Sequence, residues 1–331
     1  MQAKWGIVAK PSVSIVTPTF RRPEEVKGLL ENISKQSVLP IEIILVDGAP
    51  TGEDETENMV RLSAGKYTFT INYIRRNGGT AIQRNYGIDV AKGEFVAFVD
   101  DDVRLEKDFL KNTLDVMGSD ENQTVGGVVG YRANEYFNTG DSERWRWYKK
   151  LGLLTVYEPG RYDFKSGYPI NNSMQVPFEG TRPVDFMTTA CAVWRRAVLD
   201  NGLRFDEFFR DYGVLEDAHF SLKAGRNWRL LQCGDALCEE LRSPLGRVSR
   251  RKIGFKSVAN YYYVFRDIAG PLTFPQKYRF WRFQAFELFR IGASAIRRRR
   301  WNDVMELIGR FEGILSVPFL PRKSVPIERS S

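Results

Sequence analysis

The sequence has few cysteines and no long apolar run. Its three cysteines, Cys191, Cys233 and Cys238, are too few and too irregularly spaced for a disulfide framework or a four-ligand zinc site. No stretch reaches the roughly 18 apolar residues that a membrane span needs, and the first residues lack the apolar core and small-residue cleavage site of a secretory signal. These absences predict a cytoplasmic protein with reduced thiols.

The usual glycine-rich phosphate-binding loops are also missing. Nothing after the first predicted strand resembles G-x-G-x-x-G, and no G-x-x-x-x-G-K-[ST] occurs, which argues against a nicotinamide dehydrogenase and a P-loop NTPase. The segment "TPTFRRP" has no glycine, whereas nucleotidyltransferases on related α/β folds normally carry a glycine-rich basic loop there. A bound nucleotide would have to be held by other residues.

The composition is that of a globular protein with an uneven charge. With 331 residues, 43% of them hydrophobic, the chain can bury one large core or two smaller ones. Residues 242–331 carry 19 Lys+Arg against 6 Asp+Glu, while residues 1–241 carry 30 against 35. The basic C-terminal third predicts an anionic partner, either a lipid surface or a nucleic acid.

Apolar segments alternate with amphipathic ones through the first half of the chain. Near-continuous apolar strands separated by amphipathic helices are typical of an α/β fold, with a mostly parallel sheet flanked by helices. The predicted strands are 13–20, 41–47, 69–76 and 94–102, and the predicted helices are 21–36, 55–65 and 80–93.

Aspartates follow two of these strands. Asp47 ends one strand, and "FVAFVDDDV" places Asp100, Asp101 and Asp102 after another. Ligands of open parallel sheets collect beyond the carboxyl ends of the strands, so these carboxylates are expected to face one crevice and to hold a divalent cation. Acidic residues after a strand can equally be turn formers or helix caps.

Two further segments carry candidate groups. "NGGTAIQRN" offers free backbone N–H groups at a helix start, and Arg84 adds a positive fork suited to phosphate.

"GVLEDAHFSLKAG" predicts a helix that begins at Glu216 and Asp217, where one carboxylate could act as a general base or both could simply complement the helix dipole. An aspartate with an ordinary pKa near 3.9 is ionised at neutral pH and needs only placement and partial desolvation for that role. The neighbouring His219 is more consistent with a structural role.

The motifs, taken in order, resemble glycosyltransferase family 2, which has the GT-A fold. They are "VSIVTPTFRRPEEVKGLLENISKQ", "IEIILVDG", "RNYGIDVAKGEFVAFVDDDV" and "GVLEDAHFSLKAG", and the likeness covers about residues 12–245. The resemblance implies an inverting transferase that uses a nucleotide-diphosphate sugar, most commonly of UDP, and a divalent cation, Mn²⁺ or Mg²⁺. Its acceptor would be a hydroxyl of a glycan or lipid-linked glycan, with no nucleic acid partner.

The resemblance also implies roles for single residues on the donor side. Thr17 and Pro18 would line the nucleotide pocket, and Asp47 would contact the base. Asp100, Asp101 and Asp102 match the family's D-x-D signature. Of these, Asp102 is expected to bind the metal directly, with Asp100 as a further metal candidate and Asp100 or Asp101 nearer the ribose or donor sugar.

On the acceptor side, Asp217 matches the second residue of the family's Glu-Asp pair and would be the base, with Glu216 orienting the acceptor or the base. The sequence departs from the family in two places. The Asp-x-Ser-x-Asp character after the second strand is replaced by "VDGAPTGEDET", and the metal-binding histidine before Ser243 is absent, so that Glu239 or Glu240 is the expected substitute.

These inferences predict a GT-A catalytic domain at 1–245, with a nucleotide-sugar half at about 1–130 and an acceptor half at about 131–245. Within the acceptor half, residues 134–173 are predicted to form a loop with aromatic residues. Residues 246–331 are predicted to be a helical basic extension. One helical face there carries Trp281, Ala285, Leu288, Phe289, Gly292 and Ile296, with Arg297–Arg300 after it.

That apolar face has two interpretations: it lies on an anionic membrane, which would make the protein peripheral on the cytoplasmic side, or it packs on the catalytic domain. Two other functions compete with the transferase. A nucleic-acid-binding protein would use the basic third but leaves the three aspartates unexplained. A pseudoenzyme would bind the sugar nucleotide without turnover.

Overall fold

The computed structural model describes residues 11–63, 65–135, 139–210, 213–243 and 248–321, which belong to two compact units. The sheet unit comprises residues 1–149, 156–162 and 169–247, and the helical unit comprises residues 150–155, 163–168 and 248–331. The two short segments of the helical unit lie within the stretch that the sequence assigned to the acceptor half.

The sheet unit is built on a nine-stranded sheet with the strand order β3-β2-β1-β4-β10-β6-β11-β5, to which β9 is added at β11. Strands β3, β2, β1 and β4 are parallel, and β10 enters antiparallel between β4 and β6. The α/β class with a mostly parallel central sheet is therefore confirmed. The strands are β1 (Val13–Thr19), β2 (Glu42–Asp47), β3 (Thr70–Arg75), β4 (Phe95–Val99), β5 (Val103–Leu105), β6 (Val125–Arg132), β9 (Thr181–Val184), β10 (Cys191–Arg195) and β11 (Arg229–Glu240).

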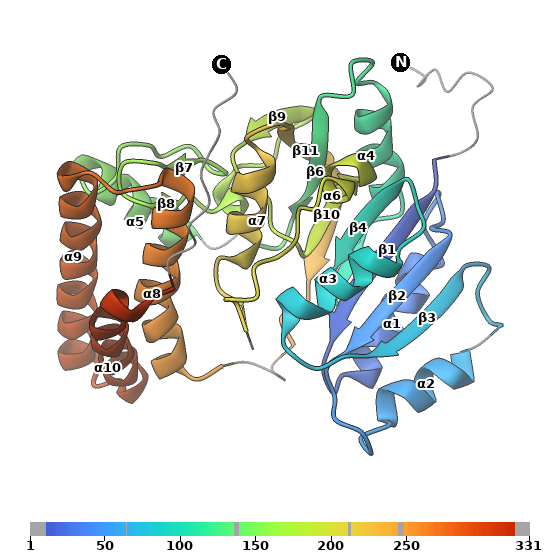
Figure 1. The fold of residues 1–331 in the computed structure, drawn as a ribbon, viewed down its shortest axis with the longest axis horizontal. Coiled ribbons are helices and arrows are strands. Elements are labelled where there is room, and N and C mark those ends of the chain that lie inside the picture. Colours follow the sequence, from blue (N-terminus) through green and yellow to red (C-terminus); the bar gives the residue numbers. More distant parts are fainter. Residues whose placement is uncertain (1–10, 64, 136–138, 211–212, 244–247, 322–331) are drawn as a thin grey trace. The chain divides into compact units, whose positions relative to one another are not determined.

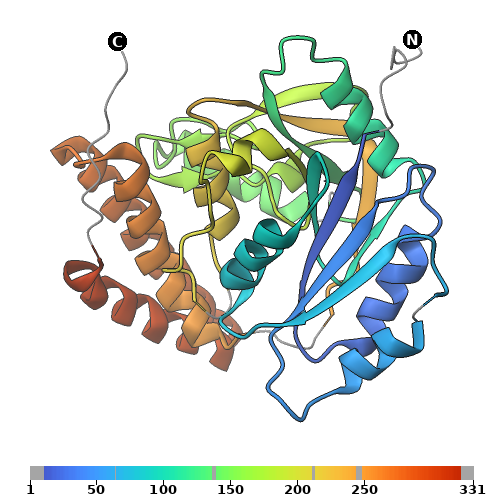
Figure 2. The ribbon, with the colours of Figure 1, turned by 45° about the vertical axis from the view of Figure 1, so that its right-hand side comes forward.

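Helices cover both faces of this sheet: α3 lies on one face, and α1 and α2 lie on the other (Figures 1 and 2). Helix α1 begins with Pro23, whose missing N–H is not needed in a first turn, and buries the apolar face that its sequence spacing predicts. The helices are α1 (Pro23–Ile33), α2 (Glu55–Ser63), α3 (Thr80–Val90), α4 (Phe109–Gly118), α6 (Arg196–Asp200) and α7 (Glu216–Ala224).

The prediction of a loop over residues 134–173 is wrong. Among its described residues, this segment contains helix α5 (Thr139–Lys150), the paired strands β7 (Tyr162–Asp163) and β8 (Tyr168–Pro169), and the 3₁₀ turn η1 (Asn172–Met174). The segment contains many Gly, Asn and aromatic residues, which suggested a loop, whereas local hydrogen bonds such as that from the Ile170 N–H to the Arg161 carbonyl at 2.8 Å give it regular structure.

The helical unit consists mainly of α8 (Arg250–Ala269), α9 (Phe274–Arg298), α10 (Trp301–Ser316) and the short η2 (Val317–Phe319). Helices α8 and α10 meet backbone to backbone. A methyl group at Gly254 would overlap the Glu306 carbonyl, and one at Gly309 would overlap the Arg251 carbonyl. Glycine is thus required on both helices, because a side chain would push them apart.

Polar groups tie the third helix to this pair. The amide of Gln284 on α9 accepts a hydrogen bond from Arg310 Nη1 at 3.1 Å and donates one to Tyr168 Oη at 2.7 Å. Among the described helices, none combines the length and apolar character that crossing a membrane requires.

Candidate active site

The carboxyl ends of β1, β2 and β4 meet at one edge of the sheet, as the sequence predicted. Thr19 at the end of β1 pairs in register with Asp47 at the end of β2, and β4 lies on the other side of β1. The side chain of Gln83 on α3 joins the first two ends, donating to the carbonyls of Thr19 at 2.9 Å and Val46 at 2.8 Å. The strand ends are therefore held together by α3.

Asp101 is enclosed by protein groups. Thr19 Oγ1 donates to its Oδ2 at 2.7 Å, and Arg22 Nη1 donates to its Oδ1 at 2.7 Å. Burial nevertheless raises the pKa of Asp101 to about 6, with Arg22 and Thr19 acting in the opposite direction. Because both oxygens are occupied, Asp101 is positioned to fix the loop that carries its neighbours.

Asp102 is less buried than Asp101 and more buried than Asp100: the side chains are 12%, 3% and 32% exposed, respectively. Its Oδ2 accepts the Ser243 N–H at 3.1 Å and lies 3.6 Å from Arg22 Nη1. Within the described part of the chain, no hydrogen bond reaches Asp102 Oδ1. Burial, and secondly the charge of Asp100, raise the pKa of Asp102. A cation beside this carboxylate would relieve both effects.

Arg84 connects the aspartate loop to helix α7. Its guanidinium is buried, with Nη2 donating to Asp100 Oδ1 at 2.9 Å and Nη1 donating to Glu216 Oε1 at 3.3 Å. The sequence predicted Arg84 as a phosphate ligand, and the structure instead gives both of its terminal nitrogens carboxylate partners. The residue thereby brings together the candidate donor-side and acceptor-side carboxylates, which lie 116 positions apart in the sequence.

The start of α7 is shaped by two special backbone positions. Leu215 precedes the helix with φ +73°, a left-handed conformation that costs a non-glycine residue about 1 kcal/mol. A methyl group at Gly213 would overlap the Glu216 carboxylate, so only glycine leaves room for it. The predicted helix is confirmed. His219 on it is buried, with its ring 5.4 Å from that of Phe209.

Asp217 does not have the ordinary pKa that the sequence suggested. Burial, followed by the negative charge of Glu216, raises the pKa of Asp217 to about 7, while the Ala218 N–H, Arg84 and Arg132 lower it. The Ala218 N–H donates to its Oδ1 at 2.7 Å. A carboxylate with a pKa near the working pH is a stronger proton acceptor than an ordinary aspartate, which suits a general base.

Glu240, the predicted substitute for the missing histidine, lies at the end of β11 against Arg132. Arg132 Nη1 donates to Glu240 Oε2 at 2.7 Å, and Arg132 Nη2 lies 2.9 Å from Glu135. Burial raises the pKa of Glu240, with smaller contributions from Glu135 and then Asp100, while Arg132 lowers it. In the described ranges, no three Asp, Glu, His or Cys side chains converge as a metal-binding group. The donor set fits a cation that is held by one or two carboxylates together with oxygens of a bound diphosphate.

The predicted nucleotide-pocket residues are all buried. Asp47 Oδ1 accepts the Ala49 N–H at 2.9 Å, and its Oδ2 accepts the Tyr73 hydroxyl at 2.9 Å. Pro18 is buried beside it, and Thr17 Oγ1 has no partner among the described residues. The roles of Thr17, Pro18 and Asp47 toward a nucleotide stay predictions.

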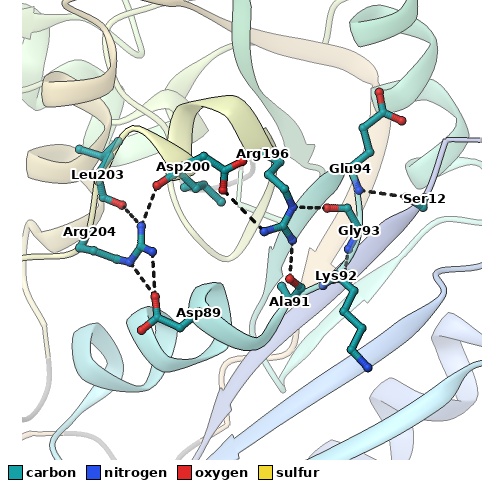
Figure 3. Close-up of polar contacts among 12 residues, drawn as sticks. Ser12, Asp89, Ala91, Lys92, Gly93, Glu94, Arg196, Asp200, Leu203 and Arg204 are labelled. Atoms are coloured by element: carbon teal, nitrogen blue, oxygen red, sulfur yellow. Dashed lines mark hydrogen bonds and ion pairs between the residues drawn. The ribbon is translucent and has the colours of Figure 1, made fainter.

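The amino ends of the same strands carry a second polar cluster (Figure 3). Arg196 donates to the carbonyls of Gly93 at 2.5 Å and Ala91 at 2.7 Å, just beyond the carboxyl end of α3. Arg204 donates twice to Asp89 Oδ1, at 3.0 and 2.8 Å. In this cluster, arginines cap backbone carbonyls and pair with two carboxylates, those of Asp89 and Asp200.

Sequence reasoning missed two basic residues of the site, Arg22 and Arg132. Arg22 binds a carboxylate 79 positions away, and Arg132 binds one 108 positions away. The only local signal was the position of each at the end of an apolar strand segment, which many surface arginines share.

The family profile, the relatives and the solved structures are all glycosyltransferases. A family profile described as Glycosyl transferase family 2 matches residues 14–202. Over 76% of this chain and 81% of its own length, a Campylobacter jejuni protein named GalNAc(5)-diNAcBac-PP-undecaprenol beta-1,3-glucosyltransferase is 23% identical. The putative teichuronic acid biosynthesis glycosyltransferase TuaG of Bacillus subtilis is 30% identical over 33% of this chain, and the match spans only 42% of TuaG.

Among solved structures, the mannosyltransferase PcManGT of Pyrobaculum calidifontis, in complex with GDP-Man and Mn2+, is similar over 92% of this chain and 88% of its own. The TM-score is 0.56 and the sequences are 17% identical. At this identity the likeness concerns the fold alone.

Proposed function

The chain belongs to glycosyl transferase family 2, as its motifs predicted, and from that premise we propose that it transfers a sugar from a nucleotide-diphosphate donor to an acceptor hydroxyl with inversion. Family members are transferases, and the fold is shared with a structure that binds GDP-Man and Mn2+. The donor nucleotide is most simply UDP, and the sugar is a hexose.

One observation carries the proposal: Arg84 bonds Asp100 and Glu216 at once. Through this residue the carboxylate loop after β4 and the carboxylate pair of α7 adjoin a single buried guanidinium. A displacement at an anomeric carbon needs charge stabilisation on the leaving-group side and a base on the opposite face. Asp100, from the leaving-group side, and Glu216, from the carboxylate pair that contains the candidate base, thus contact the same guanidinium, that of Arg84.

On the donor side, Asp102 would hold a divalent cation through its unoccupied Oδ1, with Asp100 beside it and Glu240 as a further candidate. The cation, Mn²⁺ or Mg²⁺, would neutralise the negative charge of the leaving diphosphate. Asp101, which is bound by Thr19 and Arg22, keeps the loop in place.

On the acceptor side, Asp217 would take the proton of the acceptor hydroxyl at one of its carboxylate oxygens. Its raised pKa makes it a better base than an exposed aspartate, and Ala218 fixes the orientation of Oδ1. Glu216 is held by Arg84 and would orient Asp217 and the acceptor. No protein nucleophile is needed, because a single displacement inverts the anomeric centre.

The acceptor is proposed to be a lipid-linked glycan or a cell-surface polymer. The supporting fact is that the relative matched over most of both chains is named for an undecaprenol-linked substrate. TarS of Staphylococcus aureus, 31% identical over 30% of this chain, is named for a poly(ribitol-phosphate) substrate.

A nucleotide-sugar panel with and without Mn²⁺, scored by thermal shift and by donor hydrolysis, tests the proposal. We expect one donor to raise the melting temperature only when the metal is present, and we expect Asp102→Asn to abolish that increase. Lys111→Gln, on the exposed surface of α4, is the matched control and should behave like the wild type.

Two results would contradict the proposal. If no nucleotide-sugar stabilises the protein with any divalent cation, the donor site does not exist. If a donor binds but neither hydrolysis nor transfer to lipid-linked acceptors occurs, the chain is a sugar-nucleotide-binding pseudoenzyme.

A further inference from the structure

Helix α9 turns an apolar stripe outward over its whole length. Its packed face consists of Phe280, Phe283, Gln284, Glu287 and Ile291. The outward stripe lies on the other side of the helix, and its residues follow one another at intervals of four and seven positions, which return to the same side of an α-helix. The stripe consists of Phe274, Tyr278, Ala285, Phe289 and Ile296.

The exposure of this stripe is large. Phe274 is 81% exposed, Phe289 is 74% exposed and Ile296 is 82% exposed. Of the apolar face that the sequence singled out, Ala285, Phe289 and Ile296 lie on this exposed stripe, whereas Trp281 packs within the helical unit against Tyr262 of α8. A row of exposed apolar side chains along seven turns costs free energy in water and marks an interaction surface.

Four arginines, Arg297–Arg300, follow the stripe directly and are all exposed. In this arginine turn, Arg297 and Arg298 end α9, and Arg299 and Arg300 lead to α10. Helix α10 begins with the exposed Trp301 and carries a second outward apolar row. The members of this second row are Trp301, Ile308, Phe311 and Leu315. Aromatic and aliphatic groups thus lie on both sides of a cationic turn.

The charge of the helical unit is of one sign at its surface. Residues 248–321 contain 14 Lys and Arg against 5 Asp and Glu. Within that described range every acidic residue is at least partly buried. For example, Glu287 Oε2 lies 2.8 Å from Arg290 Nη2, and Asp303 Oδ2 accepts a hydrogen bond from Ser294 Oγ at 2.8 Å. Exposed basic residues, by contrast, include Lys252, Lys277 and the arginine turn.

We propose that the stripe of α9, together with the arginine turn, binds an anionic membrane surface. Phe274, Phe289 and Ile296 would enter the boundary between headgroups and acyl chains, while Arg297–Arg300 would bind lipid phosphates. A second copy of this chain is a poorer occupant, because it would bring another strongly basic unit against the first. The inference does not depend on the proposed reaction.

Flotation of the full chain with lipid vesicles tests this surface. We expect the wild type to float with vesicles of phosphatidylcholine and phosphatidylglycerol at low salt, and to remain in the soluble fraction with phosphatidylcholine alone. Phe289→Ser combined with Ile296→Ser should weaken binding at least about tenfold. Replacing Arg297–Arg300 by glutamine should remove the preference for anionic lipid, because the negative surface potential of such vesicles attracts basic side chains near the surface.

Matched controls come from the sheet unit. Leu62→Ser removes an apolar side chain of similar exposure on α2, and a fourfold change to glutamine at Lys27, Lys35, Lys66 and Lys92 removes the same charge from exposed positions. Both controls should float like the wild type. Circular dichroism and thermal midpoints verify that each variant is folded, and donor-dependent hydrolysis should be unchanged in all of them.

Three results would overturn the proposal. The wild type could stay in the soluble fraction with anionic vesicles at low salt. The stripe and arginine variants could float as well as the wild type. Light scattering could reveal a dimer that the stripe variant dissociates, without flotation of either protein, and the surface would then be a contact between copies of the chain.

Discussion

Strands β2 and β4 end at carboxylates at one edge of the sheet, where β1 ends at Thr19, and the three strands begin beside a second set of charged groups at the other edge. At the amino edge, Glu42 accepts hydrogen bonds from Ser14 at 2.6 Å, Asn72 at 2.8 Å and the Lys92 N–H at 2.8 Å. At the carboxyl edge, Asp102 has an oxygen without a partner in the described chain, and the pKa of Asp217 is raised to about 7. Both edges contain buried charge, and the difference lies in how completely that charge is satisfied.

A saturated carboxylate stabilises the fold, whereas a partly desolvated one with spare hydrogen-bonding capacity stores free energy that a ligand can release. Substitutions at the amino edge should therefore change stability and leave transfer unaffected. Substitutions at the carboxyl edge should do the reverse. Four predictions test this division, in order of decreasing expected effect.

The largest expected difference is in the rate of transfer, between the variants Asp217→Asn and Asp89→Asn. The first removes the candidate base, and we expect the rate of transfer to fall by about 10²- to 10⁴-fold while donor binding persists. The second removes the partner of Arg204 at an exposed ion pair, so transfer should be unchanged. Transfer rates and calorimetric donor affinities measure both, and a normal rate for Asp217→Asn would disprove the catalytic assignment.

The next pair is Gly93→Ala and Gly213→Ala. A methyl group at Gly93 would overlap backbone atoms of Ser14 and Phe95, which cannot move easily, so the free energy of unfolding should fall by about 2 kcal/mol or more. At Gly213 the methyl group would overlap only the Glu216 carboxylate, a side-chain group that can shift at the expense of its contact with Arg84. There we expect a loss of activity with little change in stability, measured by urea unfolding and transfer assays. Equal stability losses for the two variants would contradict the contrast.

Glu42→Gln should have a moderate effect confined to stability. The amide can no longer accept from all three donors, and one buried donor is left unpaired at a cost of about 1–3 kcal/mol. Urea unfolding should register the loss, while the metal-dependent thermal shift with donor should keep its wild-type size. A loss of donor binding in a fully folded variant would be inconsistent with this assignment.

The smallest expected effect is on how the free energy of unfolding changes with pH. In the folded protein the pKa of Asp217 is about 7, above its ordinary value of 3.8, so the folded state holds a proton that the unfolded state has already released. The free energy of unfolding should therefore decrease as pH rises from 5 to 8. We expect the wild type to lose on the order of 1 kcal/mol more than Asp217→Asn over this range. Urea titrations at pH 5 and pH 8 measure the loss of unfolding free energy for both proteins. Equal losses would mean that the pKa of Asp217 is not raised.

Much of this arrangement could be predicted from the sequence, because it depends on local patterns. The apolar strands, the buried face of α1, the start of α7 and the aspartates after β4 all follow from residue spacing and from which residues end a strand or begin a helix. The fold class followed from the alternation of these elements. The order of the motifs identified the family.

The partners of the charged groups could not be predicted, because they are set by tertiary structure. Arg84 looked like a phosphate ligand from its place after two glycines, but the fold turns it toward Asp100 and Glu216. The pKa of Asp217 depends on burial that no local pattern encodes. The apolar face of α9 was visible in the sequence, but its outward orientation became known only from the residues that pack on the opposite side.

The close contact of α8 with α10 has a consequence for how the chain is made. Gly254 on α8 packs against the backbone of Glu306, and Gly309 on α10 packs against the backbone of Arg251. Without the other helix, each therefore exposes this backbone surface to solvent. During translation, α8 leaves the ribosome well before residues 301–316 do. Over that interval the backbone of α8 around Gly254 is open to solvent and to chaperones, and the helical unit can complete its folding only after the sheet unit has emerged.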